Sequence, residues 1–308
     1  MARYAPAALV AALLVAAGLA FLHTESLKLE TSPIRQTRVT KLFSPVCKCN
    51  TSKARIAFRL SKPDIVSITI VDSSGSDVRR LVSERPSAGR VAALWNGRDD
   101  EGAIVRNGFY RARVRLDLRE KTFALPNPIR VDKRAPRLEV VSVKPRVFSP
   151  DGDRRNDRVT VRYTVDEAAR GVLYVDGVQR VLGASTKPAG ELRWFGMIGA
   201  RSLPAGSYAL SAGAVDLAGN RAVPVAAGPV RIRYVELPAR VIRVKAGSLI
   251  RVHVLTDARR VQWRLAGRTG VGRPPVFRIR APQRNGRFRL FVTANGHGSA
   301  AAVVVTGA

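Results

Sequence analysis

The sequence predicts an all-β protein of tandem β-sandwich domains behind an N-terminal transmembrane or signal helix. Strict alternation in VTVRYTV, residues 159–165, has the period of a half-buried strand. The phrase FSP, followed by such a strand, opens at Phe43 and again at Phe148, 105 residues later. A repeated opening of this kind indicates tandem domains. The side chains expected to face the core of the second copy are Val159, Val161, Tyr163 and Val165.

Length and charge limit the possible classes. A chain of 308 residues has room for two or three domains. The net charge is +30, from 53 Lys and Arg against 23 Asp and Glu, which attracts nucleic acid, anionic lipid or acidic wall polymers. A second interpretation is that Arg simply fills solvent-facing strand positions. Because the Arg residues are spread through segments such as RARVRL, VRYTV and RIRY, this second interpretation is favoured over a dedicated nucleic-acid surface.

The N-terminal segment 1–22 contains an uncharged run of eighteen residues, Ala5 to Leu22. Its length is at the lower limit for a transmembrane helix and exceeds the usual apolar core of a signal peptide. We therefore expect a signal-anchor. The small-x-small sequence Gly18-Leu19-Ala20 offers a cleavage site, so a cleaved signal peptide is the alternative.

The orientation of the segment has evidence on both sides. Arg3 and the terminal amine precede it, whereas Lys28, Arg35, Arg38 and Lys41 follow it, and positive-inside counting would then keep the body of the protein in the cytoplasm. The two cysteines and the short N-terminal tail favour export. We expect a single-pass cell-membrane protein with an extracytoplasmic body, or a secreted protein if the leader is cut.

The first domain is expected over residues 42–136, after a basic tether over 23–41. Asp72 to Gly75 marks a hairpin turn between two of its strands. The side chains expected to face its core are Ala54, Ile56, Phe58 and Leu60 on the opening strand, then Tyr110, Ala112, Val114 and Leu116.

The second domain, residues 137–236, repeats this plan. Trp194 follows Trp95 by 99 residues and Tyr208 follows Tyr110 by 98, which agrees with the 105-residue offset after small deletions. A third segment, residues 237–308, has the same short alternating runs separated by turn residues, but it lacks the opening FSP phrase. We expect it to form a smaller β-sandwich of five or six short strands.

The two repeats resemble the Ig-like domain named after FlgD, the flagellar hook-capping protein, whose tandem copies occur in bacterial surface and secreted proteins. The resemblance covers about two thirds of the chain and implies Ig-like β-sandwiches used as spacers, adhesion modules or appendages. A hook-capping role is not implied, because the match does not extend to the other regions of that protein. The matching segments are residues 148–165, 66–82, 87–114 and 204–220.

The loop after Phe148 carries four oxygen-bearing side chains within seven residues: Asp151, Asp153, Asn156 and Asp157. Ca²⁺ takes six to eight oxygen ligands, and loops bring alternate carboxylates to one point. The loop is similar to the FSPNGDGxND phrase of bacterial surface domains, which implies calcium, but Arg154 and Arg155 replace small residues. The alternative, slightly favoured, is an Asx turn in which these side chains cap local backbone groups.

Cys47 and Cys49 occupy the equivalent loop of the first copy, where these carboxylates are missing. A C-x-C pair closes a small disulfide in an oxidising compartment. Half of a metal site is less favoured, because the sequence has no third Cys and no nearby His. We predict a disulfide that staples the loop, with a free thiol pair as the alternative.

No catalytic residue is expected. The three His residues are scattered, and no HExxH, GxSxG or GxxxxGK[ST] motif occurs. The sequence predicts a non-enzymatic, membrane-tethered envelope or surface protein. Its Ig-like domains would form a structural or adhesive array that binds a partner protein or an anionic polymer. The alternative from another class is a cytoplasm-facing basic protein that binds nucleic acid. A third is a non-catalytic accessory part of an envelope enzyme complex.

Overall fold

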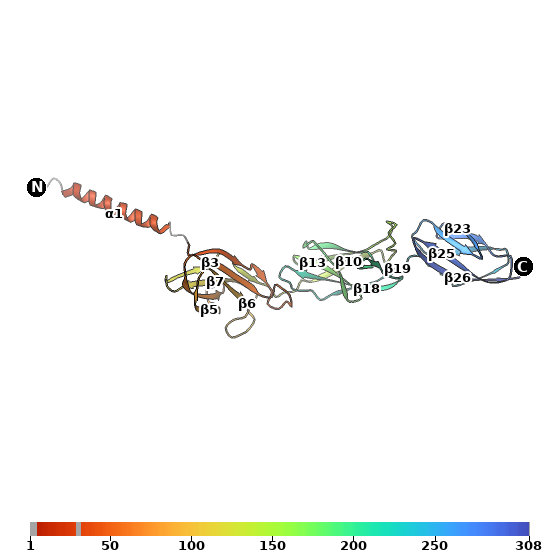
Figure 1. Cartoon of the computed structure of the whole chain (residues 1–308), viewed down its shortest axis with the longest axis horizontal. Coiled ribbons are helices and arrows are strands. Elements are labelled where there is room, and N and C mark those ends of the chain that lie inside the picture. Colours follow the sequence, from red (N-terminus) through yellow and green to blue (C-terminus); the bar gives the residue numbers. More distant parts are fainter. Residues whose placement is uncertain (1–4, 29–31, 308) are drawn as a thin grey trace. The chain divides into compact units, whose positions relative to one another are not determined.

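The computed structural model describes residues 5–28 and 32–307. A single helix, α1 (Ala5–Lys28), precedes the strands, and the rest of the described chain is β structure and loops (Figure 1). Among the described residues, none of the helical structure combines the length and apolarity needed to cross a bilayer. The chain divides into two compact units, residues 1–132 and 133–308.

The first unit is a sandwich of two sheets, with strand orders β1-β3-β6 and β2-β9-β7-β4-β5, and β8 paired to β7. The predicted core residues of its opening strand and of β7 are buried, which confirms the alternation. Its strands are β1 (Ile34–Val39), β2 (Leu42–Phe43), β3 (Ala54–Leu60), β4 (Asp64–Val71), β5 (Asp77–Ser87), β6 (Arg90–Trp95), β7 (Gly108–Leu116), β8 (Lys121–Ala124) and β9 (Ile129–Val131).

The tether predicted over 23–41 is wrong for part of its length. Residues 34–39 form β1, which pairs antiparallel with β3, and the helix extends to Lys28. Only Ile34 and Val39 of β1 pack against the core cluster. The strand was not predicted from the sequence, because the polar residues between Ile34 and Val39 leave no alternation of apolar and polar side chains.

Three aromatic side chains form the centre of the first sandwich. The ring centroids of Phe43 and Trp95 lie 5.4 Å apart, and those of Trp95 and Tyr110 lie 5.1 Å apart. The Tyr110 hydroxyl donates to the carbonyl of Arg106 at 2.9 Å. The ring is therefore buried while its hydroxyl remains satisfied, as a buried tyrosine requires.

The second sandwich repeats this centre at Phe148, Trp194 and Tyr208. The centroid distances are 5.6 and 5.9 Å, and the Tyr208 hydroxyl donates to the carbonyl of Pro204, again four residues earlier. The repeat seen in the sequence is therefore a repeat of one packing arrangement.

A glycine beneath the FSP phrase accompanies the aromatic trio in both copies. Gly97 and Gly196 have φ of +72° and +65°, and a Cβ there would lie 2.6 Å from Pro45 and 2.7 Å from Pro150, respectively. Both the backbone conformation and the close approach of proline require glycine.

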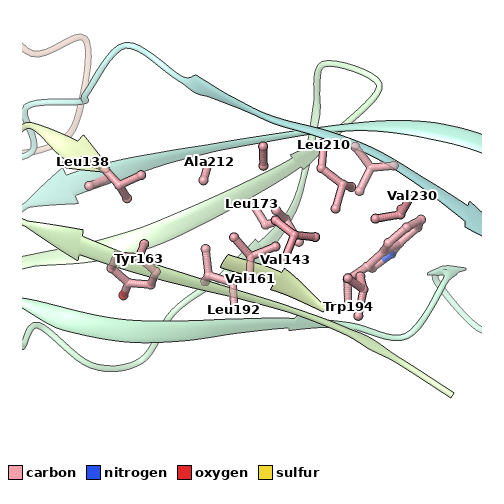
Figure 2. Packing of buried hydrophobic residues seen from close by; sticks show 14 of the residues in the cluster. Leu138, Val143, Val161, Tyr163, Leu173, Leu192, Trp194, Leu210, Ala212 and Val230 are labelled. Atoms are coloured by element: carbon pink, nitrogen blue, oxygen red, sulfur yellow. The ribbon is translucent and has the colours of Figure 1, made fainter. Parts of the chain in front are cut away.

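The second sandwich has sheets of order β10-β12-β15 and β11-β19-β18-β13-β14, and its inner faces enclose the core drawn in Figure 2. The four predicted core residues of β12 are buried, as expected. Its strands are β10 (Leu138–Lys144), β11 (Val147–Phe148), β12 (Val159–Val165), β13 (Ala169–Val175), β14 (Val178–Leu182), β15 (Ala189–Trp194), β16 (Met197–Ile198), β17 (Arg201–Ser202), β18 (Gly206–Asp216) and β19 (Val225–Ile232).

The remainder of the second unit has its own hydrophobic cluster and two sheets, of order β20-β26-β25-β22-β23 and β21-β24. Trp263 packs against this cluster and covers Gly270, where a Cβ would lie 2.6 Å from the indole. The strands are β20 (Val241–Lys245), β21 (Leu249–His253), β22 (Val261–Leu265), β23 (Arg268–Gly272), β24 (Val276–Arg280), β25 (Gly286–Ala294) and β26 (His297–Thr306).

Candidate functional site

The loop that joins β11 to β12 is held by its own carboxylates. Asp157 accepts hydrogen bonds from the backbone amides of Gly152 and Arg154, at 2.8 and 2.7 Å. Both of these residues have positive φ, so the carboxylate stabilises a backbone that few side chains favour. Asp157 therefore acts as the Asx-type cap that the sequence offered as the alternative to a calcium ligand.

Asp151 and Asp153 also accept local backbone hydrogen bonds, from the amides of Asp153 at 3.3 Å and Arg155 at 2.8 Å, and both lie close to a third carboxylate. One oxygen each of Asp151, Asp153 and Asp257 lies within 4.8 Å of the others. Asp257 is on the connection between β21 and β22, more than a hundred residues away in the sequence. The cluster is thus built by two different sandwiches of the same compact unit.

The amide of Asn295 also faces this cluster. Its nitrogen lies 3.1 Å from an Asp151 oxygen and 3.4 Å from an Asp153 oxygen. Asn295 and Gly296 form the two-residue loop between β25 and β26, and both have positive φ, as a type I′ hairpin requires. An amide that turns over presents its oxygen instead, so Asn295 can face either a carboxylate or a cation.

Asp257 is the least compensated member of the cluster. Both of its carboxylate oxygens are buried, and neither has a hydrogen-bond partner among the described residues. Burial raises the pKa of Asp257 above its ordinary value, and the charges of Asp151 and Asp153 raise it further. Asn156 lies close enough to offset part of this rise, although its geometry falls short of a hydrogen bond.

The arrangement changes the predicted ligand set. Asp151, Asp153 and Asp157 all accept backbone hydrogen bonds within the loop, but only Asp151 and Asp153 also come together with Asp257, beside which Asn156 lies. Sequence reasoning missed Asp257 and Asn295. Asp257 did carry a signal, because it is the only acidic residue of segment 237–308.

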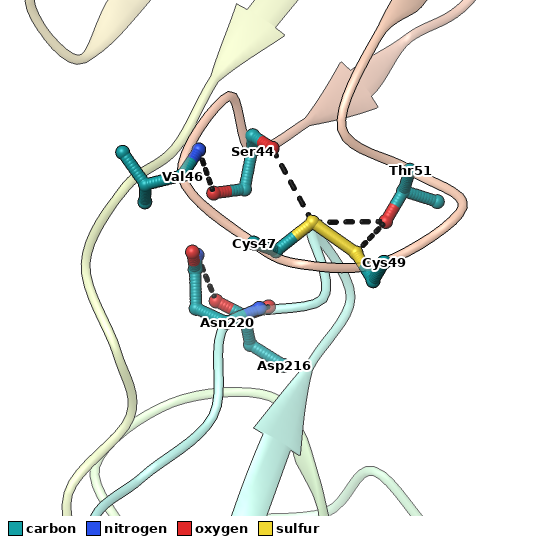
Figure 3. Close-up of a disulfide and its surroundings, with 7 residues drawn as sticks. All are labelled: Ser44, Val46, Cys47, Cys49, Thr51, Asp216 and Asn220. Carbon is teal, nitrogen blue, oxygen red and sulfur yellow. Dashed lines mark hydrogen bonds between the residues drawn. A yellow bond between two sulfur atoms is a disulfide. The ribbon is translucent and has the colours of Figure 1, made fainter.

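The equivalent loop of the first copy is closed covalently. Cys47 and Cys49 form a disulfide, with a Cα–Cα distance of 5.2 Å (Figure 3). A disulfide sulfur has no proton, so the Thr51 hydroxyl is the donor in its 3.0 Å contact with the Cys49 sulfur. Ser44 supports the same loop, because its hydroxyl accepts a hydrogen bond from the amide of Val46 at 3.4 Å.

The described histidines are not arranged as a catalytic pair. The ring of His297 stacks on Tyr234, with centroids 3.6 Å apart and planes at 4°. His253 lies on β21, exposed and opposite Val276. The carboxylates around Asp257, in contrast, form a group of titratable side chains close enough together to hold a cation.

Comparison with known proteins identifies the type of domain. Residues 46–118 match the model of the FlgD Ig-like domain, so the first sandwich is an Ig-like domain of the FlgD type. This confirms the resemblance and the Ig-like fold class predicted from the sequence. No curated protein matches the chain.

Solved structures give more distant likenesses. FlgD from P. aeruginosa is 21% identical, with 37% of this chain and 83% of that chain covered and a TM-score of 0.24. The fibronectin(III)-like modules of Clostridium thermocellum CbhA are 14% identical, with 64% and 94% covered and a TM-score of 0.37. Titin domains I67–I69 are 9% identical, with 90% and 99% covered and a TM-score of 0.31.

Proposed function

We propose that this chain is a non-enzymatic structural and binding protein whose β domains work outside the cytoplasm. The observation that carries the proposal is the series of sandwiches, the first of FlgD type, each with its own filled hydrophobic core. Domains of this type occur in extracellular or surface proteins and typically serve as non-catalytic modules. Because the cores are filled with side chains, binding falls to the loops and the outer sheet faces.

The export part of the proposal has two supports. The uncharged run from Ala5 to Leu22 lies in α1 and has the composition of an export leader, whether retained as a signal-anchor or removed after Ala20. The Cys47–Cys49 disulfide fits an oxidising compartment, because cytoplasmic thiols are normally kept reduced.

The proposed partner is an anionic envelope polymer or a partner protein. A net charge of +30 favours a polyanion through long-range attraction. The competing function, cytoplasmic binding of nucleic acid, rests on the same charge and on the basic residues that follow the leader. The two proposals differ in the compartment where the β domains lie.

The proposed cofactor is a divalent cation of the calcium type, held by Asp151, Asp153 and Asp257. The two buried and unpartnered oxygens of Asp257 support it, because such oxygens are costly unless a cation or donor compensates them. Asn295 can add its amide oxygen as a further ligand. In this proposal the cation joins the second sandwich to the third.

Thiol trapping tests the compartment. Intact cells are quenched in acid, free thiols are alkylated, and the mass of the purified chain is measured before and after reduction. We expect no alkylation before reduction and two alkylated cysteines after it. Two thiols already alkylated in the unreduced sample would contradict export and favour the cytoplasmic alternative. The same spectrum shows whether residues 1–20 have been removed.

A further inference from the structure

The positive charge of the chain is concentrated in its third sandwich. Residues 237–308 contain fourteen Lys and Arg and one acidic residue, whereas the preceding residues contain 39 basic and 22 acidic residues. The acidic residue is Asp257, whose carboxylate oxygens are buried against Asp151 and Asp153 and so do not neutralise the outer surface. The segment differs from the rest of the chain in its near-absence of acidic residues, while its Arg residues are spread over its strands as the sequence indicated.

Five of these cations share one face of the sheet β20-β26-β25-β22-β23, and we call them the basic sheet face. The cross-strand register places Arg243, Val304 and Arg287 in one row, and Phe291 opposite Arg264 in another. Every cation of the face is exposed. The residues of the basic sheet face are Arg243, Lys245, Arg264, Arg287 and Arg289.

The sheet β1-β3-β6 of the first sandwich also lacks acidic residues, whereas Arg side chains on other strands of the first two sandwiches have acidic partners. Arg113 pairs with Asp77, for example, and Glu191 lies between Arg162 and Arg193. None of the five strands of the basic sheet face contains an acidic residue, and its cations have no ion-pair partner in the described part of the chain. The mutual repulsion of these cations is therefore uncompensated within the fold.

The centre of the face is shaped for planar anionic groups. The guanidinium carbons of Arg264 and Arg289 lie 5.0 and 4.9 Å from the centroid of the Phe291 ring. A guanidinium held against a ring keeps its N–H edge free for a carboxylate or phosphate. Because Phe291 is engaged by two cations, it is poorly placed to stack on a nucleic-acid base.

A shallow groove of about 600 Å³ runs beside this centre. Its lining includes the polar side chains of Gln262, Thr269 and Thr293 together with Arg264 and Phe291. Amide and hydroxyl groups of this kind can bind sugar hydroxyls, while the cations bind the charges. Charges two residues apart on a strand lie roughly 6.8 Å apart, so one strand can contact successive charges of an extended polymer.

We propose that the basic sheet face binds a linear anionic polysaccharide. This inference rests on the proposed function and names the surface and the chemistry of its partner. Cations supply most of the attraction, so binding weakens with salt, and the groove supplies contacts that depend on sugar hydroxyls.

The test measures binding of the purified full-length chain to polygalacturonate, with neutral dextran and single-stranded DNA as comparison polymers. The variant Arg264→Gln/Arg289→Gln removes two charges from the basic sheet face. The matched variant Arg251→Gln/Arg278→Gln removes two exposed charges from the other sheet of the same sandwich, where the residues face each other across β21 and β24.

We expect binding to polygalacturonate that the first variant weakens at least tenfold and the matched variant less than twofold. Protection of Arg264 and Arg289 from phenylglyoxal by polygalacturonate, measured by mass spectrometry on the unaltered chain, gives the same information without a variant. Equal weakening by both variants would overturn the proposal and indicate diffuse attraction. Tighter binding of DNA with the same dependence on Arg264 and Arg289 would overturn it in favour of nucleic acid. If Arg264→Gln/Arg289→Gln weakens binding no more than the matched variant does, this inference fails. The proposed function outside the cytoplasm would still be supported if thiol trapping finds the cysteines oxidised in cells.

Discussion

Asp257 carries the one negative charge of the third sandwich and places it beside two further carboxylates. Its raised pKa means that, without a cation, ionisation of this group costs stability. Its contribution is therefore most favourable below the pKa of an unfolded aspartate, about 3.9. That contribution is lost as the pH rises through the higher folded pKa.

Asp257→Asn should consequently stabilise the protein at pH 7 when a chelator has removed Ca²⁺. The substitution should also abolish the stabilisation that Ca²⁺ gives the unaltered chain. Ca²⁺ should raise the melting temperature of the unaltered chain at pH 7. At a Ca²⁺ concentration a hundredfold above Kd, the free energy of unfolding should rise by about 2.7 kcal/mol. The gain from the substitution without Ca²⁺ should shrink as the pH falls toward 4.

The matched control is Glu191→Gln, which removes one charge from an exposed carboxylate with two Arg partners. It should keep the full Ca²⁺ shift. A melting curve of the unaltered chain that neither Ca²⁺ nor chelator moves would contradict the cation site, as would an unchanged shift in Asp257→Asn.

Gly196 is the second residue whose role is settled by its surroundings. Gly196→Ala places a Cβ 2.7 Å from Pro150 at a φ of +65°, so we expect a loss of about 2–3 kcal/mol in the free energy of unfolding. Gly177→Ala has a similar φ of +77° but open space, and should cost about 1 kcal/mol. Urea unfolding of both variants measures the difference. Equal losses would mean that contact with the FSP proline contributes nothing.

At the scale of the elements, the two FSP loops are held by different means. The second copy ties its loop with Asp157 on backbone amides, and the first copy closes its loop with Cys47–Cys49. The covalent loop is very short, so the entropy it removes from the unfolded chain is modest.

Cys47→Ser/Cys49→Ser should therefore lower the stability of the first unit by only about 1–2 kcal/mol. Chemical unfolding monitored by the fluorescence of the three tryptophans, of which Trp95 lies in the first unit, measures this by comparison with the unaltered chain in the presence and absence of reductant. Reductant should reproduce the effect of the double substitution in the unaltered chain and should leave the variant unchanged. A variant that is as stable as the oxidised chain would contradict a stapling role.

The strands were predictable wherever one face is buried and the other is exposed to solvent. Alternation identified β3, β7 and β12, because each buries every second side chain. It failed for β1, where polar residues separate Ile34 from Val39. The candidate site was only half predictable, because local sequence shows Asp151 and Asp153 as neighbours but does not show that a distant Asp257 completes their cluster.

At the scale of the whole molecule, charge and domain plan act together. The first sandwich matches a FlgD-type module, the second repeats its aromatic centre, and the third combines fourteen basic residues with a single acidic one. The composition of the whole chain does not show this division, because a net charge of +30 does not reveal which segment lacks acidic residues. The repeats therefore supply the architecture, and in our proposal the third sandwich binds the polymer.

The most direct test of the central claim is protease accessibility of the β domains in wall-stripped intact cells, with a cytoplasmic protein as the internal control. The account predicts that the sandwiches are digested, or at least cut between the two compact units near residues 132–133, while the cytoplasmic control stays intact. Protection of the whole chain until the cells are lysed would contradict export and would make nucleic acid the leading partner.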